Sequence, residues 1–154
     1  GEKSARAFLF EIGDTVLDFA VITFPALWAK VTTLPLGSYE SVRPGTRIIV
    51  VGDPLGIEDV VQKGETFAKR VPYFHDFPKW KWVVPYDVNS VGGYSGSPVI
   101  DVRTGRVIGL HRGAILDPRG SGRSIGLFVP MELIARILAT YGYPIDYDRP
   151  VTAE

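Results

Sequence analysis

Residues 92–98 have the sequence GGYSGSP, and the apolar pair Val99-Ile100 follows directly. Glycines on both sides of Ser95 allow the backbone to turn sharply around one serine side chain. The main-chain N–H groups of Gly93 and Ser95 can then converge on one point, where they would stabilise a developing oxyanion. A serine hydroxyl becomes a good nucleophile when a neighbouring base takes its proton. The pattern therefore predicts a nucleophilic serine, and its alternative interpretation is a plain Gly/Ser turn before a strand.

Short apolar runs separated by turn residues occupy most of the chain around this loop. Runs of this length and spacing predict an all-β sandwich or barrel. The expected strands are 5–12, 19–24, 47–51, 60–68, 80–84, 98–102, 107–111 and 124–129, with a hairpin turn at 103–106. One amphipathic helix is expected to begin at Pro130, because apolar residues recur at helical spacing over 133–138. Gly142 is expected to end this helix.

Several further segments, together with the loop at Ser95, resemble the trypsin-like superfamily of serine proteases. The loop is similar to the family's Gly-x-Ser-Gly-[Gly/Ser]-Pro pattern. The segment DFAVI at 18–22 is similar to the one that carries the family's catalytic aspartate. RPG at 43–45, VGDPLG at 51–56 and Val129-Pro130 before the helix resemble the high-temperature-requirement proteases of that superfamily.

This resemblance implies a chymotrypsin-like double β-barrel, with the first barrel incomplete in this chain, closed by the C-terminal helix. It implies peptide-bond hydrolysis through an acyl-enzyme on Ser95, with Asp18 orienting a catalytic histidine and with the Gly93 and Ser95 N–H groups as the oxyanion hole. The alternative for Asp18 is a polar turn residue ahead of a strand. A polypeptide substrate is the expected partner, and no metal or organic cofactor is expected.

The histidine that the family places before its aspartate is missing from the residues that precede Asp18. The chain has two histidines, His75 and His111, and both follow Asp18. We therefore expect the catalytic histidine on an upstream segment or on a separate N-terminal fragment of the same protein. His75 lies among aromatic and proline residues and is expected to be a loop residue rather than the base. The alternative function is a catalytically inactive protease-like module that binds peptides or a partner protein.

His111 lies in the segment GLHRG, residues 109–113, one hairpin after the serine loop. This segment resembles the Gly-[Ile/Leu]-His segment of bacterial glutamyl endopeptidases and of viral chymotrypsin-like proteases that cut after Gln or Glu. The resemblance implies that His111 lines the specificity pocket, assisted by Ser90 five positions before the nucleophile. Imidazole suits this role because it can donate a hydrogen bond in a partly desolvated pocket. The alternative is a strand histidine whose hydrogen bonds serve only the fold.

Composition and charge limit the kinds of partner and of chemistry that we expect for the protein. The 154 residues carry 17 basic and 17 acidic side chains, so the zero net charge favours neither nucleic acid nor a membrane surface as a partner. The absence of cysteine excludes disulfides and thiol catalysis. No signal peptide or membrane-spanning run is visible, so a soluble protein is expected and its compartment stays open. One protease domain is expected over 1–143, followed by an extended tail over 144–154.

Overall fold

The computed structural model describes residues 8–14, 19–23, 32–66, 83–89, 93–116, 119–122 and 124–147. The strands are β1 Phe8–Asp14, β2 Phe19–Thr23, β3 Arg47–Gly52, β4 Val60–Thr66, β5 Val84–Asp87, β6 Pro98–Asp101, β7 Arg106–Leu116 and β8 Ser124–Pro130. The helix α1 spans Met131–Thr140, and two 3-10 turns, η2 and η3, span Tyr39–Ser41 and Pro54–Gly56.

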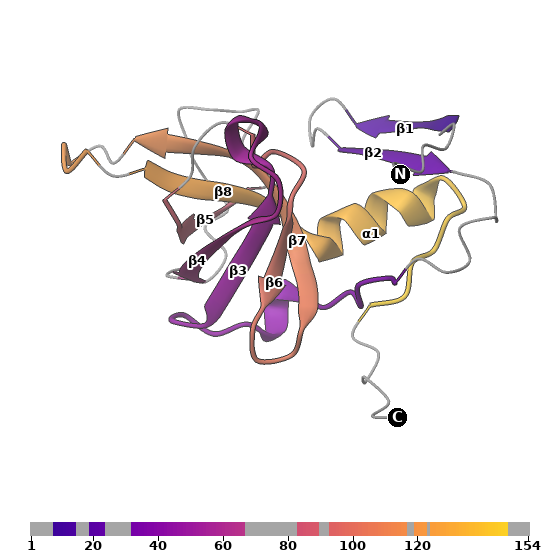
Figure 1. The fold of residues 1–154 in the computed structure, drawn as a ribbon. Coiled ribbons are helices and arrows are strands. Elements are labelled where there is room, and N and C mark those ends of the chain that lie inside the picture. Colours follow the sequence, from indigo (N-terminus) through magenta and orange to yellow (C-terminus); the bar gives the residue numbers. More distant parts are fainter. Residues whose placement is uncertain are drawn as a thin grey trace.

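Six of these strands form a closed antiparallel barrel in the order β3-β4-β5-β8-β7-β6 (Figure 1). The barrel closes where β6 pairs with β3, which places Ile49 opposite Ile100. Strands β5 and β8 also pair across a long sequence separation, with Val84 opposite Phe128. The strands β1 and β2 form a separate antiparallel pair. Because the barrel is closed, none of its six strands has a free edge. Closure also places loops that are distant in the sequence next to one another.

Buried apolar side chains form two clusters, one inside the barrel and one beside it. Side chains alternate between the two faces of β3, so Ile48 and Val50 both point into the barrel, where each is about 1% exposed. The barrel cluster consists of Tyr39, Val42, Ile48, Val50, Val84, Tyr86, Val88, Tyr94, Val99, Ile108 and Phe128. The outer cluster joins barrel residues to α1 and consists of Val83, Val107, Leu127, Val129, Met131, Leu133, Ile134 and Leu138. Phe19 and Val21 of β2 pack on the outer cluster, and the β1–β2 pair lies along α1 beside the barrel (Figure 1).

The C-terminal helix is confirmed, with its start one residue later than expected. Pro130 has extended backbone angles and still pairs with Gly109, so it caps the helix rather than forming its first turn. After the helix, Gly142 has a positive φ, and the N–H of Tyr143 bonds to the carbonyl of Leu138 at 2.9 Å. This geometry ends the helix as the sequence predicts. Within the part of the chain that the structure describes, no helix has the length and apolar character needed to cross a bilayer.

The strands β5 and β7 differ most from their predicted bounds, and β1 ends at Asp14, two residues later than predicted. The strand β5 occupies 84–87, whereas the sequence favoured 80–84, of which 80–82 lie outside the described residues. The strand β7 continues to Leu116, because a bulge between His111 and Gly113 restores its pairing with β8. The predicted hairpin turn at 103–106 is confirmed between β6 and β7.

Residues 35–40 form hydrogen bonds with both the barrel and the helix α1. The N–H of Val107 donates to the Pro35 carbonyl at 2.8 Å, which holds the segment along the start of β7. Further along, Ser38 Oγ donates to Oε1 of Glu132 at 2.5 Å, and the Glu40 N–H donates to the same oxygen at 3.0 Å. Glu132 is in the first turn of α1, where a carboxylate also complements the helix dipole. The position of α1 is therefore fixed by polar contacts as well as by the outer cluster.

Candidate active site

The predicted nucleophile lies at the tip of the short loop 93–97 that leads into β6. Ser95 is exposed, while Tyr94 before it is buried against the barrel cluster. The N–H of Ser97 bonds to the Tyr94 carbonyl at 3.0 Å and closes the turn around the serine. Gly93 has a φ of 106°, a conformation that side-chain-bearing residues rarely adopt. The loop therefore presents one hydroxyl to solvent on a backbone that the sequence can form only with glycine.

Strand β7 holds this loop through three hydrogen bonds. The N–H of Gly96 donates to the His111 carbonyl at 2.7 Å, and the His111 N–H donates to the Ser97 carbonyl at 2.8 Å. The hydroxyl of Ser95 donates to the backbone carbonyl of Arg112 at 3.1 Å. The predicted nucleophile and the predicted specificity residue are thus neighbours in space, although they are separated by a hairpin in the sequence.

The loop between β3 and β4 supports the nucleophile loop from the other side. A β-carbon added to Gly93 would lie 2.8 Å from the Asp53 carbonyl oxygen and 2.9 Å from the Leu55 nitrogen. A β-carbon added to Gly52 would lie 2.3 Å from Ser97 Oγ. Gly93 therefore allows two backbones to touch, and Gly52 leaves room for the Ser97 side chain. This contact explains why the segment 51–56 accompanies the serine motif, since it forms the surface on which residues 93–97 rest.

His111 is buried beside the nucleophile loop at about 3% exposure. Its Nδ1 lies 2.5 Å from the hydroxyl of Tyr86, a residue of β5 with no exposed surface. The rings of Tyr86 and Tyr94 meet the imidazole edge-on, with centroids 5.8 and 6.2 Å away. Burial lowers the pKa of His111 to about 4 and raises that of the Tyr86 hydroxyl well above its ordinary value. Both side chains are therefore uncharged at neutral pH.

The structure brings together some predicted site residues and leaves others outside its description. Ser95, Gly93 and His111 converge at the β6–β7 end of the barrel. Asp18, Ser90 and His75 lie outside the described residues, so their assigned roles stay predictions.

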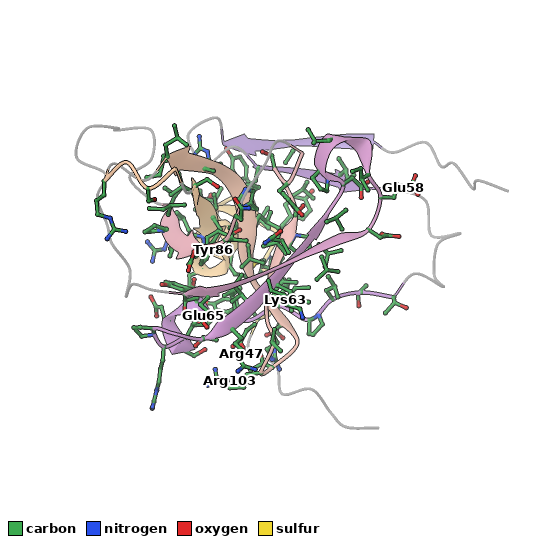
Figure 2. All side chains as sticks on the ribbon, turned by 60° about the vertical axis from the view of Figure 1, so that its left-hand side comes forward. Arg47, Glu58, Lys63, Glu65, Tyr86 and Arg103 are labelled. Carbon is green, nitrogen blue, oxygen red and sulfur yellow. The ribbon has the colours of Figure 1, made fainter. Side chains whose placement is uncertain are left out.

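The sequence analysis missed Tyr86, which contacts His111 because β5 and β7 both flank β8 in the barrel. Opposite Tyr86, Gly126 has no side chain, and a β-carbon there would lie 2.7 Å from the tyrosine ring. The feature of the sequence that could have indicated this close packing is Gly126, a glycine within an otherwise apolar strand. Figure 2 shows Tyr86 within the barrel, whereas Arg47, Lys63 and Glu65 extend from the outer surface of β3 and β4.

Similar sequences are found among serine proteases. A family model described as a trypsin-like peptidase domain matches residues 2–110. The magnetosome formation protease MamE of Paramagnetospirillum magneticum is 29% identical over 117 residues, which cover 76% of this chain and 16% of that protein. The putative serine protease HhoA of Synechocystis sp. is 28% identical over 121 residues, which cover 77% of this chain and 29% of that protein. The chain therefore spans less than a third of the length of these relatives.

A solved structure, the HtrA-type protease AlgW with a decapeptide, resembles this chain with a TM-score of 0.70 and 23% identity. The similarity covers 90% of this chain and 41% of that one. At this level of identity, the likeness concerns the fold. It confirms the expected all-β, chymotrypsin-like architecture with its C-terminal helix.

Proposed function

Because the chain belongs to the trypsin-like peptidase family, we propose that it is the nucleophile-bearing part of a serine endopeptidase. The observation that carries this proposal is the exposed hydroxyl of Ser95 on a glycine-shaped loop that two other segments hold in place. A plain turn before a strand would need neither the positive φ of Gly93 nor its close contact with the segment 53–55. Such rigid positioning of one side chain is what a covalent mechanism requires.

In the proposed mechanism, Ser95 Oγ attacks the carbonyl carbon of the scissile peptide bond while a histidine base takes the hydroxyl proton. The Gly93 and Ser95 N–H groups donate hydrogen bonds to the resulting oxyanion. The histidine then gives the proton to the leaving amine, and the acyl group stays on Ser95 until water hydrolyses it. Asp18 orients the histidine and stabilises it while it is charged.

We further propose that the base is a histidine outside these 154 residues, on an N-terminal segment or fragment of the same protein. Two contacts support this assignment. Ser95 Oγ donates its proton to the Arg112 carbonyl rather than to an imidazole nitrogen. His111 directs Nδ1 to Tyr86, and its main chain binds residues 96 and 97, so none of these contacts is with Ser95 Oγ.

We also propose that a specificity pocket beside Ser95 gives the enzyme a preference for Glu or Gln before the scissile bond. His111 supports this preference because it is a buried polar ring next to the nucleophile loop. Ser90 is assigned to the same pocket from its place in the sequence. A pocket built to hydrogen-bond a polar side chain discriminates strongly against an apolar one.

A serine-directed fluorophosphonate probe tests the proposed activity. The purified protein, together with any polypeptide that co-purifies with it, should react with the probe at one serine. Ser95→Ala should abolish the labelling, whereas Ser41→Ala, a change at an exposed serine of η2, should leave it intact. Equal labelling of the wild type and Ser95→Ala would contradict the enzyme assignment and favour a catalytically inactive module that binds peptides. Intact-mass analysis of the same sample would show whether a histidine-bearing fragment accompanies the chain.

A further inference from the structure

A cavity lies between the helix α1 and the chain segment that follows it. The chain turns back after α1 (Figure 1), and Ile145 packs against the outer cluster. The cavity has a volume of about 340 Å³. A water molecule in the liquid occupies roughly 30 Å³, so the space can hold a side chain or a small molecule. Its lining includes Glu132, Ala135, Arg136 and Ala139 of α1, together with Glu40 and Ile145.

The wall of this cavity contains a buried carboxyl oxygen that lacks a hydrogen-bond donor. Glu132 is 7% exposed, and its Oε1 accepts hydrogen bonds from the Ser38 hydroxyl and the Glu40 N–H. Its second oxygen, Oε2, is buried and has no hydrogen-bond partner among the described residues. Arg136 lies four positions along α1, a spacing that allows an ion pair, yet it does not donate to Oε2. A buried polar atom without a partner is unfavourable, so a ligand that supplies a donor gains the missing hydrogen bond.

The lining of the cavity indicates the chemistry of such a ligand. A carboxylate oxygen forms its strongest hydrogen bonds with positively charged donors. Glu40 and Glu132 bring two carboxyl groups to the cavity and Arg136 brings one guanidinium, so these groups favour a single added cation. The N-terminus of α1 contributes about half a unit of positive charge, which reduces the negative excess without cancelling it. The methyl groups of Ala135 and Ala139 provide an apolar wall for an aliphatic stem.

We propose that this cavity binds a lysine side chain of a polypeptide partner. The ammonium group donates to Oε2 of Glu132, and the four-carbon stem lies against Ala135 and Ala139. The terminal torsion of a glutamate is soft, so Oε2 can turn towards the ammonium while Oε1 keeps its contact with Ser38. Arg136, which is exposed, then donates to a backbone carbonyl of the partner. A free diamine fits less well, because its second cation would meet the guanidinium.

The first test measures binding by NMR and needs no catalysis. The purified protein is labelled with 13C at its alanine methyl groups, and the signals of Ala135 and Ala139 are identified by comparison with Ala135→Ser and Ala139→Leu. The probe is the capped tripeptide acetyl-Gly-Lys-Gly-amide. Its matched control has norleucine in place of lysine, which keeps the stem and removes the ammonium. The lysine peptide should shift both methyl signals to saturation, whereas the norleucine peptide should not. The free diamine cadaverine should bind more weakly than the lysine peptide.

The second test repeats the titration with variants of the cavity wall. In Glu132→Gln, an amide oxygen still accepts from Ser38 and the Glu40 N–H, while an NH2 group that cannot accept replaces Oε2. The dissociation constant of the lysine peptide should rise at least about 10-fold, the scale of one lost hydrogen bond to a charged group. Glu58→Gln, a change at an exposed carboxyl outside the cavity, is the control and should bind like the wild type. Ala139→Leu fills the cavity from the exposed face of α1 and should also abolish binding.

Each result of these titrations decides one part of the proposal. Absence of any shift with the lysine peptide would mean that water alone fills the cavity, and it overturns the proposal. Equal binding of the norleucine peptide, or unchanged binding in Glu132→Gln, overturns the contact between the ammonium and Oε2. Tighter binding of cadaverine overturns the assignment to a polypeptide. If Glu132→Gln does not fold, Ala139→Leu is decisive, because unchanged binding in that variant places the lysine elsewhere on the protein. The cavity shares no lining residue with the nucleophile loop, so serine labelling and this test succeed or fail independently.

Discussion

Gly93 lies so close to Pro54 that a β-carbon on the glycine would be 2.7 Å from the proline Cα. Neither atom belongs to a flexible side chain, so a larger residue at 93 must displace backbone. The nucleophile loop is thus positioned by a contact between two main chains, and small changes in that contact should displace the proposed oxyanion hole.

Gly93→Ala is expected to lower kcat/KM about 100- to 1000-fold, because the displaced loop loses one of its two oxyanion donors. The change should fall mainly on kcat. Gly56→Ala is the matched control, since this glycine of η3 also has a positive φ but its added β-carbon would meet no atom within 4 Å. The control should lose stability through backbone strain and keep its activity. Similar losses of activity in both variants would mean that the contact with Pro54 does not position the site.

Asp18→Asn is expected to lower kcat about 10⁴-fold, because an amide stabilises the wrong tautomer of the catalytic histidine. The role of Asp18 is inferred from a family motif in the sequence, so the experiment tests whether that motif identifies the orienting carboxylate. Asp14→Asn, a neighbouring carboxylate at the end of β1, is the control and should retain most of the activity. A larger loss in Asp14→Asn than in Asp18→Asn would reassign the orienting carboxylate. Steady-state kinetics on one peptide substrate is sufficient for this comparison.

His111→Ala is expected to lower kcat/KM for Gln or Glu substrates roughly 10- to 1000-fold, the scale of one buried hydrogen bond to a polar group. Hydrolysis of peptides with Leu or Phe at the same position should change much less, because they make no such bond. His75→Ala should affect neither class. Preferential cleavage after Arg, Lys or Leu by the wild type would contradict the pocket assignment and leave the protease assignment intact.

The resemblance of the segment around His111 to a specificity-pocket segment predicted that it lies near Ser95, and strand β7 does bond to the nucleophile loop there. It also predicted the barrel strands β3, β4, β6 and β8 nearly to their ends. It did not predict the contact of His111 with Tyr86, since that contact depends on β8 lying between β5 and β7 in the closed barrel. The aromatic residues at 80–82 favoured an earlier β5, whereas the observed strand is fixed by its pairing with Gly126 and Phe128. Pairing between distant strands carries no local pattern that one sequence can display.

The stability of the protein should fall between about pH 6.5 and pH 4, partly through His111. The folded pKa is about 4, below the value near 6.5 of an unfolded histidine, so the unfolded chain binds more protons across this interval. The contribution of His111 is complete above pH 6.5 and is lost as the pH falls towards 4, with a limit of roughly 3 kcal/mol. Urea unfolding at several pH values should show that the free energy of unfolding depends less on pH in His111→Gln than in the wild type or His75→Gln. Identical slopes in all three proteins would contradict the neutral, buried imidazole.

Ser38→Ala is expected to lower the free energy of unfolding by about 1–3 kcal/mol, because Glu132 loses a buried hydrogen-bond donor. Ser41→Ala in the same segment removes only the hydrogen bond that the exposed Ser41 donates to the Ser38 carbonyl at 2.9 Å, and it should cost about 1 kcal/mol or less. Urea midpoints for the two variants give the comparison. Equal midpoints would show that the outer apolar cluster alone holds α1 against the barrel.

The nucleophile loop obtains its hydrogen-bond partners from a strand that follows it in the chain. During synthesis, a polypeptide that has left the ribosome only as far as Pro98 contains Ser95 but lacks the carbonyls of His111 and Arg112 that hold the loop. Those carbonyls reach their places when β7 pairs with β8, the last strand of the barrel. Vectorial translation therefore delays assembly of the serine site until the last strand of the barrel has emerged. The order of the strands in the chain therefore prevents Ser95 from being held in place before β7 and β8 have paired.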